Sequence, residues 1–158
     1  MTTPSLGSII LASTDPERLR SWYIHAFGAM PNPDGFLEFG DVAVLIVPRD
    51  DVGARCAEPG RIILNLHVDD AKTMVTHLDG LGVSWVAELE LRTDAWFATL
   101  RDPDGNFVQV IELTDAYWAA RGRPSALSRA RVTARLPAQD LQRARRFYAE
   151  VLGLTPAE

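Results

Sequence analysis

The spacing of hydrophobic residues changes several times along the first 113 residues. Residues 7–13 are mostly apolar and predict a strand. From residue 16 onward, apolar side chains recur every three or four positions, which predicts an amphipathic helix. Either Thr14 or Asp15 is suited to cap this helix, Pro16 fits its first turn, and Gly28 ends it.

A similar order of elements then appears twice. Apolar runs at 36–39 and 42–47, joined by Gly40 and Asp41, predict a hairpin. After a polar loop come a strand at 61–68, a helix capped by Asp69 or Asp70, and strands at 83–88, 95–100 and 107–113. The order of strand, helix and strands therefore recurs with a period of roughly 55 residues, which indicates a weak internal repeat.

The strongest local signal is the run Asp102-Pro103-Asp104-Gly105-Asn106, which precedes the last strand of the repeat. Proline fixes φ, glycine accepts a positive φ, and Asp and Asn hydrogen-bond their own backbone. We therefore expect Asp102 and Asp104 to build a tight turn rather than to act as a catalytic pair of carboxylates.

Three segments together resemble the vicinal-oxygen-chelate superfamily: residues 8–28, 64–83 and 100–113. This superfamily contains glyoxalase I, bleomycin-resistance proteins, fosfomycin-resistance enzymes and extradiol dioxygenases. The resemblance implies an α+β fold of paired βαβββ modules, whose curled mixed sheets form a cup with flanking helices. It also implies a homodimer, because single-domain members often complete the cup between two chains.

The resemblance divides the chain into three parts. Residues 1–114 are expected to form a glyoxalase/bleomycin-resistance-like domain, and residues 115–127 a short helix and linker. Residues 128–158 resemble the opening strand and helix of an incomplete second domain. We expect this last segment to pack on the main domain or on a dimer mate through the apolar residues Leu141, Phe147, Tyr148 and Leu152.

Enzymes of the superfamily hold a divalent metal with His, Glu or Gln side chains from four strands. The resemblance places these four positions at Ser8, within residues 42–47, at Ile63 and at Gln109. Among them, Gln109 alone could be a ligand, and a single amide oxygen binds a metal weakly. We therefore predict no metal cofactor. The alternative is a divalent metal held by a divergent set of ligands around His67, Gln109 and Glu38.

Polar and aromatic side chains near Gln109 are candidates for a ligand site. Strand alternation places Asn65 and His67 on one face. His67 has two interpretations, a ligand-binding group or base, and a strand-end histidine near solvent. Trp96 and Phe97 point in opposite directions, so one of them should face the cup. The predicted ligand-binding residues are Gln109, Asn65, His67, Trp96, Phe97 and Ser8.

Composition narrows the function further. The chain has 158 residues, 47% of them hydrophobic, which suits one globular domain. Its single cysteine, Cys56, excludes an internal disulfide, and no leader or long apolar run is evident, so we expect a cytoplasmic protein. No phosphate-binding loop, nucleophile elbow or paired-cysteine metal motif occurs.

Charge is distributed unevenly. Residues 1–120 hold 18 acidic and 8 basic side chains, a balance of −10, whereas residues 121–158 hold 3 acidic and 8 basic, a balance of +5. An acidic main domain argues against nucleic acid as a partner. It would concentrate a cationic ligand, or it serves solubility alone.

These observations lead to one main hypothesis and two alternatives. The main hypothesis is a metal-free protein, similar to bleomycin-resistance proteins, that binds a small aromatic or cationic molecule in the cup without transforming it. The first alternative is a metal-dependent glyoxalase/lyase or dioxygenase-type enzyme. The second is a degenerate domain kept for assembly with a partner.

Overall fold

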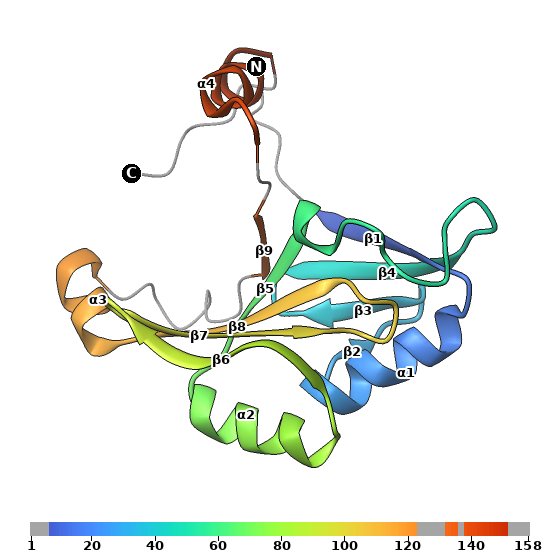
Figure 1. The fold of residues 1–158 in the computed structure, drawn as a ribbon, viewed down its shortest axis with the longest axis horizontal. Helices are drawn as coiled ribbons and strands as arrows, with labels where there is room; N and C mark the ends of the chain where they lie inside the picture. Colours follow the sequence, from blue (N-terminus) through green and yellow to red (C-terminus); the bar gives the residue numbers. More distant parts are fainter. Residues whose placement is uncertain (1–6, 123–131, 136–137, 152–158) are drawn as a thin grey trace.

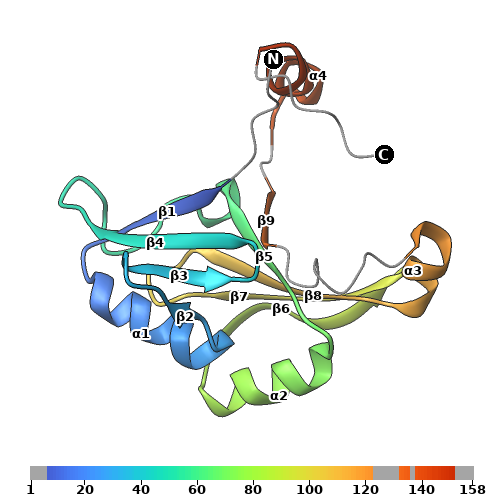
Figure 2. The same cartoon turned by 180° about the vertical axis from the view of Figure 1, so that it is seen from behind.

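The computed structural model describes residues 7–122, 132–135 and 138–151. Two sheets form the body of the protein, and helices α1 and α2 lie on the same side of them (Figures 1 and 2). The first sheet has the strand order β1-β4-β3-β2, and the second has the order β6-β7-β8-β5-β9. The fold is therefore α+β with two mixed sheets, as predicted.

The bounds of the elements follow chain order. The first sheet contains β1 (Ser8–Ser13), β2 (Met30–Pro31), β3 (Phe36–Phe39) and β4 (Val42–Pro48). The second contains β5 (Ile63–His67), β6 (Ser84–Arg92), β7 (Ala95–Arg101), β8 (Phe107–Leu113) and β9 (Val132–Arg135). The helices are α1 (Pro16–Phe27), α2 (Ala71–Gly80), α3 (Asp115–Arg121) and α4 (Leu141–Arg146). Helix α4 continues as a π-helical turn over Phe147–Val151, and a 3₁₀ turn spans Pro59–Arg61.

Both halves of the body share one topology. The first strand of each half is parallel to its last strand, β1 to β4 and β5 to β8, and the remaining pairs within each half are antiparallel. The first strands begin at Ser8 and Ile63, 63 − 8 = 55 residues apart. The period expected from the sequence is confirmed, and the two halves are the paired βαβββ modules.

Side-chain caps set the starts of both long helices. The Asp15 carboxylate accepts a hydrogen bond from the backbone N–H of Arg18 at 3.2 Å, and Asp70 accepts one from Thr73 at 2.9 Å. The cap of α1 is therefore Asp15 and not Thr14. The cap of α2 is Asp70 and not Asp69. Gly28 ends α1 with φ of 65°, a left-handed conformation that suits glycine.

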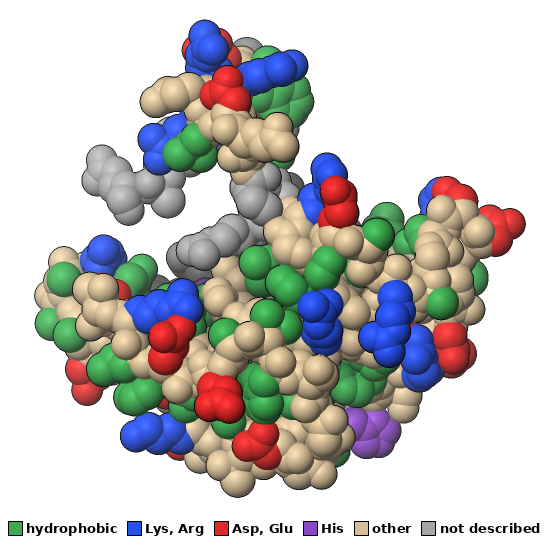
Figure 3. Space-filling model, viewed as in Figure 1, with side chains coloured by type: hydrophobic (Ala, Val, Ile, Leu, Met, Phe, Trp, Pro, Cys, Tyr) green, Lys and Arg blue, Asp and Glu red, His purple; other side chains and the backbone are tan. Residues whose placement is uncertain are grey.

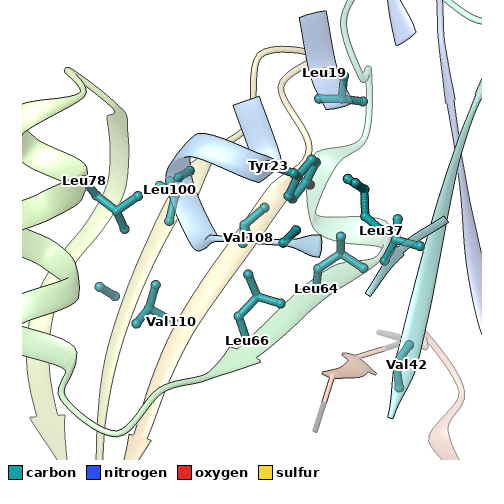
Figure 4. Close-up of a cluster of buried hydrophobic side chains, with 14 of the residues drawn as sticks. Leu19, Tyr23, Leu37, Val42, Leu64, Leu66, Leu78, Leu100, Val108 and Val110 are labelled. Atoms are coloured by element: carbon teal, nitrogen blue, oxygen red, sulfur yellow. The ribbon is translucent and has the colours of Figure 1, made fainter. Parts of the chain in front are cut away.

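The core lies between the helices and the two sheets (Figure 4). Tyr23 of α1 is almost fully buried there, close to Leu37 of the first sheet and Val108 of the second. Burying an aromatic or branched side chain of this size is worth about 1.5–3 kcal/mol relative to leaving it exposed. Helix α1 therefore joins the two modules through apolar contact with both sheets.

The Asp102–Asn106 turn anchors the same helix. Asp102 accepts hydrogen bonds from the backbone N–H groups of Asp104 and Asn106, at 3.0 and 2.9 Å, which is the turn-building role expected from the sequence. Its other oxygen accepts a hydrogen bond from the Tyr23 hydroxyl at 3.0 Å, and Arg18 of α1 pairs with Asp104. Burial raises the pKa of the Asp102 carboxyl, although hydrogen bonds from Asn106 and Tyr23 oppose this effect.

The strand of the C-terminal segment joins the main domain. Strand β9 pairs antiparallel with β5, from Ile63 opposite Arg135 to Leu66 opposite Val132. This agrees with the expectation that the segment begins with a strand that packs on the main domain.

Helix α4 stands away from the body of the protein (Figures 1 and 2), and its surface shows both basic and hydrophobic side chains (Figure 3). Leu141 is 56% exposed and Phe147 50% exposed. The expectation that this helix packs on the main domain is therefore wrong for the described residues. The pairing with β5 holds β9 on the main domain but does not involve α4. Packing of α4 on a dimer mate, the alternative, stays a prediction, and Leu152 lies outside the described residues.

Two strands differ most from the sequence prediction. Strand β6 continues to Arg92, four residues past the predicted end at Glu88, because Arg92 still pairs with Ala95 of β7. Strand β2 was missed, since two residues are too few to show alternation. Within the described residues, no helix is long and apolar enough to cross a membrane.

Helices α1 and α4 provide a matched pair for testing the role of Tyr23. Asp140 caps α4 as Asp15 caps α1, and Tyr148 follows its cap by the same eight residues as Tyr23. We predict that Tyr23→Phe lowers the free energy of unfolding by about 1–3 kcal/mol at neutral pH, because a buried hydrogen bond is lost. The control Tyr148→Phe should leave it unchanged, since that side chain has no such partner among the described residues. Urea unfolding measures both, and equal effects would contradict the role of Tyr23.

The same variant should change the response to alkaline pH. Burial, followed by the charge of Asp102, raises the pKa of Tyr23 well above its ordinary value, so the folded state keeps the phenol proton. The unfolded chain loses this proton near pH 10, and the free energy of unfolding then falls by about 1.4 kcal/mol per pH unit. The stability advantage of the natural protein over Tyr23→Phe should therefore shrink above about pH 10. An advantage that stays constant would show that Tyr23 ionises normally in the fold.

Candidate functional site

The five-stranded sheet has one face that is turned away from the helices, which we call the open face. Leu64, Val108 and Leu100 belong to the core beneath the sheet. Because side chains alternate along a strand, the residues between such core positions lie on the other side. On the three central strands, the open face consists of Ile63, Asn65 and His67 of β5, Phe107, Gln109 and Ile111 of β8, and Phe97, Thr99 and Arg101 of β7.

Strand register arranges these nine residues in three rows, with adjacent strands about 4.8 Å apart. The middle row contains Thr99, Gln109 and Asn65, which are paired across β7, β8 and β5. The flanking rows are Phe97, Ile111 and His67 on one side, and Arg101, Phe107 and Ile63 on the other. A polar row therefore crosses the sheet between two rows that are mainly apolar.

The middle row is buried and incompletely satisfied. The Gln109 amide donates a hydrogen bond from Nε2 to the Thr99 hydroxyl at 3.1 Å. Asn65 is 8% exposed, and its Oδ1 atom has no hydrogen-bond partner among the described residues. A buried acceptor without a partner costs about 1–3 kcal/mol. A bound molecule that donates an N–H or O–H to Asn65 would remove this cost.

Aromatic rings flank the polar row. Phe97 lies beneath the Arg92 guanidinium, 5.7 Å from it, and Phe107 lies 4.8 Å from the guanidinium of Arg101. The two rings can form apolar walls for a flat molecule, and the arginines add charged edges.

The structure resolves the choice between the two neighbouring aromatic residues of β7. Phe97 shares the open face with Gln109, as the register shows. Trp96 packs against the core on the helix side, where Lys72 of α2 lies 5.0 Å above its ring. The proposed ligand-binding role of Trp96 is therefore wrong, because alternation turns it away from the open face.

Two further candidates lie in the other sheet. Ser8 is an exposed residue of β1, and Glu38 belongs to β3. Both are paired with Ala43 of β4, and no strand pairing connects them to Asn65 or Gln109. Within one chain, the structure therefore does not join Ser8 to the three rows.

His67 occupies the end of β5. It is half-buried and opposite Ile111 on the open face, and it also lines a hollow of about 240 Å³ together with Glu38 and Phe39. Gln109 does not line this hollow. In the part of the chain that the structure describes, no group of three His, Cys, Asp or Glu side chains could hold a metal ion. The divergent set of metal ligands is therefore only partly brought together.

Another hollow lies at the ends of β1 and β4. It has a volume of about 760 Å³ and is formed by Ser13, Thr14 and residues 48–51. Of its charged residues Arg49, Asp50 and Asp51, the first and last are exposed and bind each other. Because its one cationic side chain is already neutralised, we assign the candidate site to the open face.

Two polar residues of the open face, Thr99 and Arg101, were not among the site residues predicted from the sequence. The turn at residues 102–106 could have revealed them. A hairpin closed by these five residues pairs Arg101 with Phe107, and it then necessarily pairs Thr99 with Gln109.

The paired modules and the position of Gln109 on the last strand identify a protein of the vicinal-oxygen-chelate superfamily. The sequence model of the family described as "Glyoxalase-like domain" matches residues 8–111, so the chain belongs to this family. None of the curated proteins matches the sequence significantly.

Solved structures show the same fold. A glyoxalase I mutant from Zea mays matches with a TM-score of 0.73 and 22% identity, over 95% of this chain and 56% of that one. An integron cassette protein from Vibrio cholerae matches with a TM-score of 0.56 and 22% identity, over 71% of this chain and 97% of that one. A glyoxalase/bleomycin resistance protein/dioxygenase family enzyme from Burkholderia phytofirmans matches with a TM-score of 0.58 and 14% identity, over 70% and 99%. At these identities the likeness establishes the fold alone.

The unpaired Asn65 oxygen leads to a stability prediction. Asn65→Leu removes a buried acceptor and should raise the free energy of unfolding by about 1 kcal/mol. The matched variant Gln109→Leu should lower it by about 1 kcal/mol, because the buried Thr99 hydroxyl loses its partner. Urea unfolding of both variants provides the test. A loss of stability in Asn65→Leu would mean that the oxygen is already satisfied in the folded protein.

Proposed function

We propose that the open face binds a small organic molecule without transforming it, and that this binding does not use a metal. In this respect the protein would be similar to bleomycin-resistance proteins. The observation that carries the proposal is the buried Asn65 oxygen, which has no partner among the described residues and lies in register beside the Gln109–Thr99 hydrogen bond. A protein that binds a hydrogen-bond donor at this position compensates the cost of the unpaired acceptor.

The neighbouring residues support a binding role. Gln109 is held on the open face, because its amide Nε2 donates a hydrogen bond to Thr99. Phe97 and Phe107 border the polar row and can contact the apolar part of a ligand. An apolar surface with a few buried polar groups is typical of sites that bind small molecules.

A metal-dependent lyase, isomerase or dioxygenase is the second candidate. One observation favours it, namely that Glu38 and His67 from different modules line the same hollow. Carboxylate and imidazole ligands suit divalent transition metals. Gln109 would have to approach this pair to complete a set of ligands. The third candidate, a domain kept for assembly, would need no small ligand at all.

Two measurements on the protein purified without chelators separate these candidates. We predict less than stoichiometric transition metal by elemental analysis, and a melting temperature that rises with small aromatic molecules carrying a hydroxyl or amide donor. Asn65→Leu should abolish the rise in melting temperature, whereas Glu38→Gln in the other sheet should preserve it. One metal ion per chain, lost in His67→Ala, would instead establish the enzyme. A melting temperature that no aromatic donor raises would favour assembly.

We also propose that the protein acts in the cytoplasm as a homodimer, with neither nucleic acid nor membrane as a partner. The acidic balance of residues 1–120 supports the exclusion of nucleic acid. Exposed apolar side chains support the dimer, since Ile10 of the first sheet is 64% exposed and Met30 67% exposed. A partner chain would cover such residues.

The dimer can be tested by sedimentation at micromolar concentration. We expect twice the mass of one chain, and Ile10→Glu should shift the equilibrium toward monomer because it places a charge in an apolar interface. Leu81→Glu, which places a charge on an exposed apolar residue at the end of α2 and outside this sheet, is the control and should leave the equilibrium unchanged. A single-chain mass for the natural protein would contradict the dimer.

A further inference from the structure

The geometry points to an anion-binding position at Arg101, so that the molecule bound on the open face carries a carboxylate as well as the donor for Asn65. This inference rests on the proposed function and specifies the chemistry of its ligand. It replaces the aromatic or cationic ligand expected from the charge of the whole domain with an aromatic acid.

Arg101 has free capacity to bind an anion. It ends β7 on the open face, is half-buried, and lies 4.8 Å above the ring of Phe107. Its one hydrogen bond among the described residues is a weak contact of 3.4 Å from Nη1 to the Gly105 carbonyl. A guanidinium has five N–H donors in a planar arrangement that matches a carboxylate. Most of these donors therefore remain available on the open face.

Several other arginines of the main domain are bound to carboxylates. Arg92, on the neighbouring strand, is bound to Glu90, and Arg18 and Arg61 have carboxylate partners as well. No described carboxylate lies within ion-pair distance of Arg101. A half-buried guanidinium that lacks such a partner favours an anionic ligand, because the pair is partly shielded from water.

The open face also carries few acidic residues. Its nine central positions contain one arginine and one histidine but no aspartate or glutamate. Glu90 of the neighbouring strand β6 lies opposite Phe97 and is bound to Arg92, so its charge is already paired. Arg101 lies two rows away from Phe97, so the balance of −10 over residues 1–120 does not predict the charge of a ligand at Arg101.

The spacing of the rows limits the size of the ligand. Asn65 and Phe107 lie on adjacent strands and in adjacent rows, so their backbone positions are about 8 Å apart. The Arg101 guanidinium lies over Phe107, so this backbone spacing sets the scale of the interval between the anion-binding donors and the Asn65 acceptor. One aromatic ring with a carboxylate and a hydroxyl at opposite ends spans such an interval, while its face can contact Phe107.

The probe is 4-hydroxybenzoate, compared with the neutral 4-hydroxybenzamide and the cationic 4-hydroxybenzylamine. Dissociation constants are measured by NMR titration of the full chain. We expect the acid to bind about tenfold more tightly than the amide, since a carboxylate forms charge-assisted hydrogen bonds with a guanidinium, and the amine to bind least. This preference should disappear in Arg101→Gln and return in part in Arg101→Lys, which keeps the charge but not the planar donors.

The control variant is Arg49→Gln, which removes an exposed arginine that follows β4 of the other sheet and is bound to Asp51. It should leave the preference for the acid unchanged. Equal binding of acid and amide by the natural protein, or an unchanged preference in Arg101→Gln, would overturn the inference.

The outcomes also separate this inference from the proposed function. If Asn65→Leu weakens binding of the acid and of the amide equally, and the natural protein binds both with the same affinity, the proposed function stands and the anion-binding position does not. If binding of the acid is weakened by Arg101→Gln but not by Asn65→Leu, the anion-binding position stands and the role of Asn65 is wrong. If none of the three probes binds at millimolar concentration, both are contradicted.

Discussion

The contact between helix α1 and the Asp102–Asn106 turn is the interaction on which the rest of the structure depends. Tyr23 and Arg18 reach from the first module to Asp102 and Asp104 in the second, so the turn holds the modules together. The same turn closes the β7–β8 hairpin and thereby fixes which residues face each other across it. Thr99 lies opposite Gln109 for this reason, and a shift of one residue would turn both side chains toward the core. The positions of Thr99 and Gln109 in the candidate site are therefore set by a turn that has a structural role.

Much of the fold could be predicted because its signals are local. Asp15, Asp70 and Gly28 mark helix ends through hydrogen bonds and backbone angles within a few residues. Alternation along β5 correctly placed Asn65 on the face that carries Gln109. The choice between Trp96 and Phe97 could not be made locally, since it required the register of β7 against β8. The unpaired oxygen of Asn65 depends on every neighbour that could have reached it, and no sequence pattern contains that information.

Helices α1 and α4 also show that local sequence does not determine whether a residue is buried. Both begin with a capping aspartate, followed at the same spacings by an arginine and a tyrosine. Tyr23 is nevertheless buried against Asp102, whereas Tyr148 is exposed on a helix that stands away from the body (Figure 1). Equal sequence signals give equal helices, but burial depends on whether a sheet with an acidic turn is present to receive the helix. The exposed apolar residues of α4 are therefore consistent with the proposed dimer.

The charge and the hydrogen bonding of the open face differ from those of the domain as a whole. The domain is acidic, yet the three central strands around Gln109 place no carboxylate on the open face, and the most distinctive atom there is an acceptor without a partner among the described residues. The central claim is that this acceptor binds an organic donor and that no metal occupies the position. A crystal structure of the protein grown with 4-hydroxybenzoate, recorded with anomalous scattering, tests it most directly. The account predicts ring-shaped density with its hydroxyl in hydrogen-bond contact with Asn65 Oδ1 and no anomalous peak on the open face. An anomalous peak coordinated by His67 and Gln109 would contradict it.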